Sequence, residues 1–266
     1  MQNKIFLSDL IVKRFKKPFI SCMNGNFQYH IINDLLPNEI ADTIANGFPS
    51  EEVLREKNNL REYKRVGVDF NKYDQIMEEI TYAFHEDSVV SKISQITDIK
   101  NIVPDHKLYA GGLSSMSKNN FLNPHLDNSH NDEKSMYRVL NLLYYVSKDW
   151  REDFGGNLIL YPNGLNNENV VIPCKFNSLV LMETNDKSFH GVSKVISNEP
   201  RRCISNYYFS KDSSNGKSYS HVTSFYSFKK DSFLKQTGLF FDRKIRQNFS
   251  RHYKSLINHK NWHKRD

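Results

Sequence analysis

The chain has 266 residues, a formal net charge of +7 and a hydrophobic content of 38%. This length allows one large domain, or a core domain with an appendage, and leaves ample sequence to bury a core. No run of apolar residues approaches the roughly 18 that a membrane helix needs, so the composition excludes a membrane-spanning protein.

The cysteines and the first residues of the chain bear on its compartment. Cys22, Cys174 and Cys203 are odd in number and lack the spacing of a metal-binding motif, which argues against a disulfide framework. Charged residues interrupt the apolar ones throughout MQNKIFLSDLIVKRFKKPF, and this pattern lacks the core of a signal peptide. We therefore expect a cytoplasmic protein.

Residues 1–104 are predicted to form a mainly helical support region. Segments 35–48, 71–84 and 89–99 each carry apolar residues at helical spacing. The second segment has the strongest pattern, because six of its residues share one helix face: Tyr73, Ile76, Met77, Ile80, Ala83 and Phe84.

After Pro104 the pattern changes to short apolar strands separated by turn residues. Eight such strands follow without a helical period between them: KLYAGGL, NFLNPHLD, YRVLNLLYYVS, GNLILY, VVIP, NSLVLME, FHGVSKVI and CISNYYFS. They predict a mainly β protein with flanking helices, in which residues 105–210 form a jelly roll and the helices pack outside one sheet. We expect residues 1–104, 105–210 and 211–266 to make one compact unit.

The positive charge is concentrated at the end of the chain. Residues 241–266 hold eight Lys or Arg against two Asp, a net charge of +6. The basic residues are Arg243, Lys244, Arg246, Arg251, Lys254, Lys260, Lys264 and Arg265. Apolar residues recur there at helical spacing, which predicts a basic amphipathic helix. This helix either meets an anionic partner (substrate phosphates, nucleic acid or acidic lipid) or docks on the core and exposes a solvated face.

A histidine and an aspartate stand two residues apart, at His125 and Asp127, in a stretch that reads as a strand. Residues i and i+2 of a strand point to the same face, so both could bind one metal ion. A polar edge strand or an Asx turn would also explain the pair. His190 begins a later strand that can neighbour the first one in a roll. Together they would form the facial triad of non-haem Fe(II) oxygenases, although hydrolytic zinc sites use the same ligand types.

Arg201 begins the next strand, eleven residues after His190. Alternation places Arg201, Cys203, Ser205 and Tyr207 on one face of that strand. A guanidinium one strand from the metal would bind a carboxylate bidentately, and a dicarboxylate such as 2-oxoglutarate fits this arrangement. Hydrolytic zinc chemistry needs no such second anchor, so Arg201 favours iron. The alternative is an ordinary surface charge.

Four motifs follow one another between residues 107 and 210. They are HLD at 125–127, LLYYVSKDW running into FGGNLILY at 142–161, FNSLVLME and FHGVSKV within 176–195, and RRCISNYYF at 201–209. In order and spacing, this region resembles the Fe(II)/2-oxoglutarate dioxygenases of the prolyl-4-hydroxylase type. The flanking LYAGGLS and SYSHVTSFY resemble a bacterial branch of these enzymes.

The resemblance implies a double-stranded β-helix, a cupin-like jelly roll, with His125, Asp127 and His190 as ligands of Fe(II). It also implies that a basic residue near the start of the last core strand binds 2-oxoglutarate. Arg201 falls at that position, while Arg202 lies one place beyond it and on the opposite face.

Two tyrosines acquire an implied role from the same resemblance. Tyr145 would donate a hydrogen bond to the C5 carboxylate of 2-oxoglutarate. Tyr109, in the strand expected before the metal motif, would lie near the metal-chelating end. For each, the alternative is a core aromatic residue. The implied cofactor and co-substrates are Fe(II), 2-oxoglutarate and O₂, with ascorbate as a candidate reductant.

The implied reaction is hydroxylation of an aliphatic C–H bond with release of succinate and CO₂. The basic tail suggests a small-molecule or glycan-precursor substrate that carries negative charge. A peptidyl-proline substrate is the alternative that the motif match favours. Nucleic acid comes third, because no stacking or base-flipping element is recognisable. A roll that has lost activity and only binds glycan or protein is a further alternative, which the complete triad and Arg201 disfavour.

Overall fold

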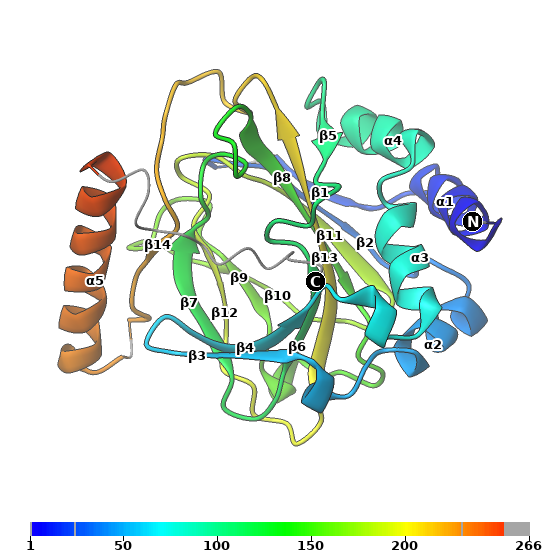
Figure 1. Cartoon of the computed structure of the whole chain (residues 1–266), viewed down its shortest axis with the longest axis horizontal. Helices are drawn as coiled ribbons and strands as arrows, with labels where there is room; N and C mark the ends of the chain where they lie inside the picture. Colours follow the sequence, from blue (N-terminus) through cyan, green and yellow to red (C-terminus); the bar gives the residue numbers. More distant parts are fainter. Residues whose placement is uncertain (1, 24, 230, 253–266) are drawn as a thin grey trace.

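The computed structural model describes residues 2–23, 25–229 and 231–252 (Figure 1). Its helices are α1 (Gln2–Phe15), α2 (Asn38–Asn46), α3 (Gln75–Ala83), α4 (Asp87–Thr97) and α5 (Phe233–His252). Its strands are β1 (Ile20–Cys22), β2 (Tyr29–Ile32), β3 (Arg55–Asn58), β4 (Glu62–Gly67), β5 (Val103–Pro104), β6 (Gly112–Met116), β7 (Phe121–Leu126), β8 (Tyr137–Tyr145), β9 (Leu158–Leu160), β10 (Val170–Ile172), β11 (Ser178–Glu183), β12 (His190–Val192), β13 (Arg201–Ser210) and β14 (Ser224–Phe225).

The strands form one curled antiparallel sheet with the order β1-β2-β11-β8-β13-β6-β4-β7-β12-β9-β10. Strand β4 pairs with both β6 and β7 and so joins the two halves of the roll. Strands β3, β5 and β14 attach at its sides, to β4, β13 and β7. The predicted fold, a mainly β double-stranded β-helix with helices packed outside, is confirmed.

Helices α1 to α4 cover the outer face of one half of the roll, while α5 stands apart beside β14 (Figure 1). On α3 the predicted apolar face is the buried one, since Met77, Ile80 and Ala83 are fully inaccessible. The helix begins at Asp74, whose side chain accepts a hydrogen bond from the Ile76 amide. Helix α1 was not predicted, although its residues at helical spacing join the same core: Leu7, Ile11 and Phe15.

Strand β8 shows how alternation builds both the core and the pocket. Tyr144 points outward to the core under the helices, whereas Tyr145 points into the roll and packs with the apolar residues there. Leu143 and Asn141, two and four residues before Tyr145 on the inner face, line the pocket inside the roll. One strand therefore holds the helix layer on one side and forms the site wall on the other.

Three features differ from the sequence-based expectations. Strands β1 to β4 of the first third join the sheet, so this region adds more than helices. The strand expected at residues 107–113 begins only at Gly112, because Leu108 and Gly112 have φ of 48° and 106° and the Leu108 amide closes a turn onto Asp105. Tyr109 consequently lies in a loop before β6.

The predicted basic helix is present as α5 up to His252. The rest of that prediction, residues 253–266 with Lys254, Lys260, Lys264 and Arg265, lies outside the described residues. Within the described ranges, no helix combines the length and the hydropathy required to cross a membrane.

Gly155→Ala is expected to destabilise the fold more than Gly164→Ala. Both glycines have a positive φ, 70° and 89°, so alanine at either position costs about 1–2 kcal/mol of backbone strain. A Cβ at Gly155 would lie 2.1 Å from the Lys194 carbonyl oxygen, whereas nothing lies within 4 Å at Gly164. Chemical denaturation should show a further loss of about 1–3 kcal/mol for Gly155→Ala. Equal losses would mean that the loop relieves the contact by moving.

Candidate active site

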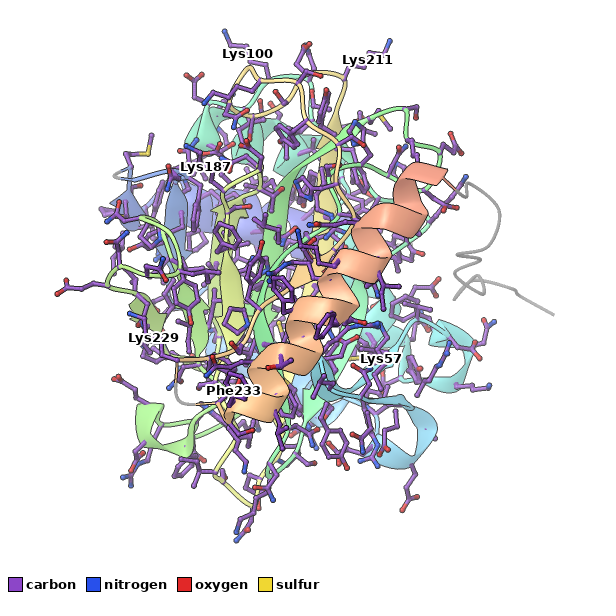
Figure 2. The ribbon with its side chains drawn as sticks, turned by 90° about the vertical axis from the view of Figure 1, so that its left-hand side faces the viewer. Lys57, Lys100, Lys187, Lys211, Lys229 and Phe233 are labelled. Atoms are coloured by element: carbon purple, nitrogen blue, oxygen red, sulfur yellow. The ribbon has the colours of Figure 1, made fainter. Side chains whose placement is uncertain are left out.

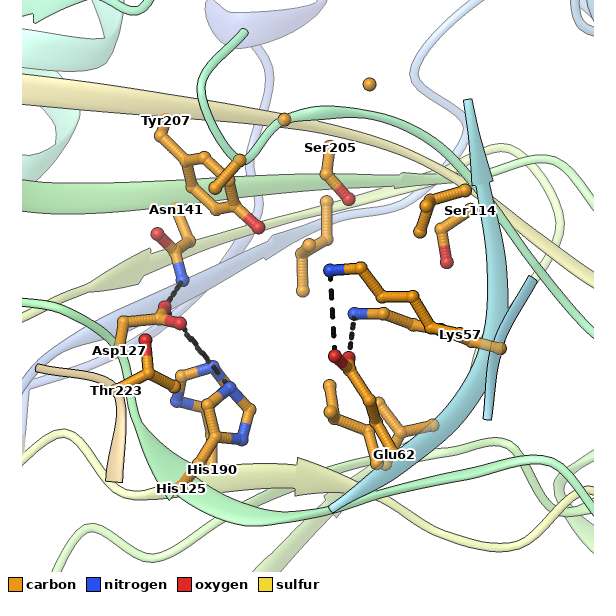
Figure 3. Close-up of a pocket in the computed structure, with 18 of the residues that line it drawn as sticks. Lys57, Glu62, Ser114, His125, Asp127, Asn141, His190, Ser205, Tyr207 and Thr223 are labelled. Atoms are coloured by element: carbon orange, nitrogen blue, oxygen red, sulfur yellow. Dashed lines mark hydrogen bonds and ion pairs between the residues drawn. The ribbon is translucent and has the colours of Figure 1, made fainter. Parts of the chain in front are cut away.

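Two strands that are distant in sequence bring three metal-ligand side chains together. His125 lies at the end of β7, Asp127 follows that strand, and His190 begins β12. The strands pair antiparallel with His190 directly opposite His125. One ligand atom from each of the three residues lies within 4.8 Å of the others, and Figure 3 shows the side chains converging on one point of the pocket. The predicted early and late strands are therefore neighbours.

Hydrogen bonds fix the orientation of both imidazoles. Nδ1 of His125 lies 2.9 Å from the Asn123 carbonyl oxygen, and Nδ1 of His190 lies 2.9 Å from that of Ser188. A carbonyl only accepts, so each Nδ1 carries the proton and each Nε2 presents a lone pair. These Nε2 atoms face Asp127 at 3.4 and 3.6 Å. Burial and the neighbouring His125 lower the pKa of His190 to about 4, which keeps it in the neutral, metal-binding form.

The two oxygens of Asp127 have different partners. Oδ2 accepts hydrogen bonds from Asn141 Nδ2 at 2.8 Å and from Arg138 Nη1 at 3.0 Å. Burial raises the pKa of Asp127, but Arg138 and the histidines outweigh it and hold that pKa well below its usual range. Oδ1, which lies nearest His125 Nε2, is left as the oxygen available to a metal.

Sequence reasoning missed Arg138 and Asn141. Arg138 is 3% exposed, and its guanidinium lies 4.0 Å from the centre of the Tyr207 ring. A register shift between Tyr208 and Phe209 interrupts the pairing of β13 with β8, so simple alternation does not predict that Arg138 points inward. Asn141 had a signal, because it is a lone amide in the apolar strand YRVLNLLYY.

The triad opens into a pocket of about 360 Å³ inside the roll. Leu143, Leu158, Val192 and Arg201 line it together with the ligands, and Tyr109 lines it from the loop before β6. This volume suits a small ligand such as a dicarboxylate with part of a second molecule.

Arg201 points into the roll, as alternation predicts, and is 3% exposed. Its Nε donates to Cys174 Sγ at 3.3 Å, and none of the described carboxylates lies within ion-pair distance of it. Arg202 faces the other way, 5.5 Å from the centre of the Phe48 ring. A buried guanidinium without an anion is costly, so Arg201 fits a site that binds a carboxylate.

The two predicted tyrosines occupy different places. Tyr145 is fully buried beside Arg201, whose guanidinium lies 5.0 Å from its ring centre. Among the described residues its hydroxyl has no hydrogen-bond partner, and burial raises its pKa well above the usual value. Tyr109 lines the pocket itself, and burial raises its pKa as well. The orphaned hydroxyl of Tyr145 beside Arg201 is the arrangement expected at a carboxylate site.

A curled β-roll that brings two histidines and a carboxylate together, with a buried arginine in the same pocket, defines the class of non-haem Fe(II) oxygenases. Residues 111–210 match the model of the 2OG-Fe(II) oxygenase superfamily. The matched region holds the three convergent side chains and Arg201, and this match together with the site supports a 2-oxoglutarate-dependent dioxygenase that uses Fe(II), 2-oxoglutarate and O₂. The residues described above fit the iron and its co-substrate.

Solved structures with a similar fold include prolyl hydroxylases. One is a Trichoplax adhaerens prolyl hydroxylase in complex with a hypoxia inducible factor peptide fragment, with 21% identity, a TM-score of 0.53 and coverage of 79% of this chain and 92% of that one. A Pseudomonas putida prolyl-4-hydroxylase has 13% identity and a TM-score of 0.53, with coverage of 77% and 98%. A Phytophthora capsici prolyl 4-hydroxylase has 15% identity and a TM-score of 0.52, with coverage of 93% of this chain and 76% of that one. No curated protein sequence matches the chain.

Proposed function

We propose that His125, Asp127 and His190 bind Fe(II), and that Arg201 binds the C5 carboxylate of 2-oxoglutarate with the Tyr145 hydroxyl as an additional donor. The observation that carries this proposal is the buried, anion-free guanidinium of Arg201 in the same pocket as the three convergent ligands. Tyr109, at the pocket wall, would lie toward the metal-chelating end of the co-substrate.

The residues of the chain bind and orient the iron and its co-substrate and exclude water from the site. The bound iron and 2-oxoglutarate supply the oxidation of an aliphatic C–H bond. Arg138 and Asn141 hold Asp127 by one oxygen, and the backbone carbonyls hold the two imidazoles. The apolar residues of the pocket wall, Leu143, Leu158 and Val192, keep solvent from the reacting centre. In this proposal residues 105–210 are the catalytic core, residues 1–104 support it, and residues 211–266 extend it.

For the substrate, we propose a small or glycan-type molecule with negative charge. Six basic residues line the pocket, against two carboxylates: Lys57, Arg61, Lys64, Arg138, Arg201 and Arg246 against Glu62 and Asp127. A peptidyl-proline substrate is the second candidate, and the similarity of the fold to prolyl hydroxylases favours it.

Succinate formation from 2-oxoglutarate by the Fe(II)-loaded protein tests the proposed activity, and its absence would leave a roll that only binds ligands. The substrate is then sought by incubation with a metabolite extract and a peptide library under ¹⁸O₂. A product that gains one ¹⁸O atom identifies the molecule. An anionic metabolite would support the first candidate, and a hydroxylated proline in a peptide would support the second.

Arg138→Met is expected to weaken metal binding by roughly 10- to 100-fold, the usual effect of losing a residue that orients a ligand. The cause is the loss of the Arg138 contact to Asp127 Oδ2. Calorimetric titration with Mn(II) measures the change, and Arg202→Met is the control because that arginine lies on the outer face. Unchanged affinity in Arg138→Met would show that Asn141 alone positions the carboxylate.

Salt should lower kcat/KM for an anionic substrate, because the Debye length falls from about 10 Å at 0.1 M to about 3 Å at 1 M. Two arginines of α5 lie near the pocket: Arg246 lines it, and Arg243 reaches the Phe225 carbonyl oxygen at 3.4 Å. Neutralising both, as Arg243→Gln and Arg246→Gln, should mimic high salt. A kcat/KM that stays constant both at high salt and in the double variant would rule out electrostatic steering by α5.

A further inference from the structure

Helix α5 exposes large apolar side chains on the side that faces away from the roll. Leu239, on the inner side, is 1% exposed. Four others are mostly uncovered, with exposed fractions of 79% at Phe233, 82% at Leu234, 58% at Phe241 and 55% at Ile245. Leu234, Phe241 and Ile245 are separated by seven and four residues, so they lie on one face of the helix and form an outer stripe. Figure 2 views the molecule from this side, with α5 in front and Phe233 at its start.

Polar residues hold α5 against the roll. Asp242 accepts two N–H groups of Arg61, which lies in the turn between β3 and β4. The Arg243 guanidinium lies 4.1 Å from the centre of the Tyr226 ring, and Arg246 lines the pocket inside the roll. An amphipathic helix on a protein surface usually turns its apolar stripe toward the core. In α5 the arrangement is reversed, so packing on the roll does not account for the outer stripe.

The charge around the outer stripe is positive. Residues 233–252 contain five Lys or Arg and one Asp, and the side chain of that aspartate, Asp242, is paired with Arg61. Lys244 lies one helical turn after Phe241 and is exposed, with its ammonium group 5.7 Å from the centre of the Phe240 ring. A partner that complements this face therefore combines an apolar layer with negative charge.

We propose that the outer stripe of α5 docks on a membrane surface that contains anionic lipids. The stripe is one helix wide, whereas a standard protein–protein interface buries about 800 Å² on each partner. A bilayer accepts the apolar face of a single helix to a depth of about 5–10 Å and attracts the Lys and Arg residues beside it. A second copy of the chain would instead add positive charge to positive charge at Lys244.

This surface is distinct from the pocket and does not depend on the proposed activity. The two are linked by α5 itself, because Arg246 lines the pocket from the same helix. Docking of the outer stripe would therefore hold the pocket close to the lipid surface.

Sedimentation of the full chain with lipid vesicles tests the proposal and requires neither iron nor turnover. The protein should bind vesicles made of phosphatidylcholine and phosphatidylglycerol in equal amounts. Phe241→Ser combined with Ile245→Ser should lower the partition coefficient at least about tenfold, because two large apolar side chains no longer enter the lipid. Equal binding by this variant and the unmodified protein, or no binding by the unmodified protein, would overturn the proposal.

Ile5→Ser combined with Phe6→Ser is the matched control. It removes the same two types of side chain at similar exposure, 55% and 51%, from α1 on the opposite side of the molecule (Figure 1). This variant should bind the vesicles as the unmodified protein does. An equal loss in both double variants would mean that any exposed apolar pair supports binding, and would overturn the assignment to α5.

Lys244→Gln tests the charge while it leaves the outer stripe intact. Binding to the anionic vesicles should fall roughly fivefold, the usual effect of one basic residue near an anionic surface, and Lys100→Gln, at an exposed lysine after α4, should have little effect. Equal binding of the unmodified protein to pure phosphatidylcholine would overturn the anionic specificity. Sedimentation velocity without lipid examines the other occupant: a dimer that Phe241→Ser with Ile245→Ser converts to a monomer would assign the stripe to a second copy and overturn the proposal.

Discussion

His190→Ala is expected to abolish Fe(II)-dependent succinate formation while leaving the fold intact. The substitution removes one of three ligand atoms that lie within 4.8 Å of one another. The loss should exceed the roughly 100-fold that follows from losing a residue that merely orients a ligand. His190 lies on the three-residue strand β12, and its side chain contributes little to either apolar core, so the melting temperature of the metal-free protein should change little.

The matched control is His130→Ala. His130 lies in the loop after β7, with its ring tilted against that of Tyr137 at 4.3 Å between centroids, and it is not part of the ligand group. Turnover by this variant should stay near that of the unmodified protein. Normal turnover by His190→Ala would disprove the assignment of the metal site, and a large fall in both variants would point to damage of the loop.

Arg201→Ala is expected to raise the KM for 2-oxoglutarate steeply. A desolvated carboxylate that loses its charged partner loses about 2–5 kcal/mol of binding free energy, which corresponds to roughly 30- to 4,000-fold in affinity. Arg201 is almost completely buried, so we expect a loss of binding free energy in this range rather than the small loss that is usual for an ion pair on the surface. Initial rates of succinate formation at varied 2-oxoglutarate measure it.

Arg202→Ala provides the comparison, because the two arginines are adjacent and point to opposite faces of β13. Arg202 packs against Phe48 and the Ala45 carbonyl under the helices, so its loss should lower stability and leave the KM for 2-oxoglutarate unchanged. If Arg202→Ala raises the KM and Arg201→Ala does not, the co-substrate is bound elsewhere.

The sequence was sufficient to predict which way a side chain points where the strand alternates regularly. Because His125 and Asp127 are two residues apart, they were predicted to share one face. The same alternation predicted that Arg201 points inward and Arg202 outward, as the structure shows. Arg138 escaped this reasoning because the register shift near Phe209 changes which residues of β8 face the pocket. Where backbone geometry departs from the regular period, sequence spacing alone stops predicting orientation.

The wall opposite the metal site was missed for a different reason. Lys57, Glu62 and Lys64 line the pocket from the first third, where the helical pattern dominates. Lys57 lies on β3, which pairs with β4, and β4 in turn pairs with β6 and β7, roughly fifty or more residues later in the chain. Pairing over such a distance leaves no local trace in the sequence. The sequence pattern predicted a strand that includes Tyr109. In the structure a turn at Leu108 delays the start of this strand to Gly112, three residues after Tyr109.

The double pairing of β4 has a consequence for altering specificity. Since β4 closes the roll between β6 and β7, changes to its backbone would disturb β7, the strand that carries His125. Strand β3 pairs, within the described part of the chain, with β4 alone. The pocket wall at Lys57 can therefore be redesigned by varying β3 and the turn after it, while at Lys64 only substitutions that keep the backbone of β4 in place are suitable.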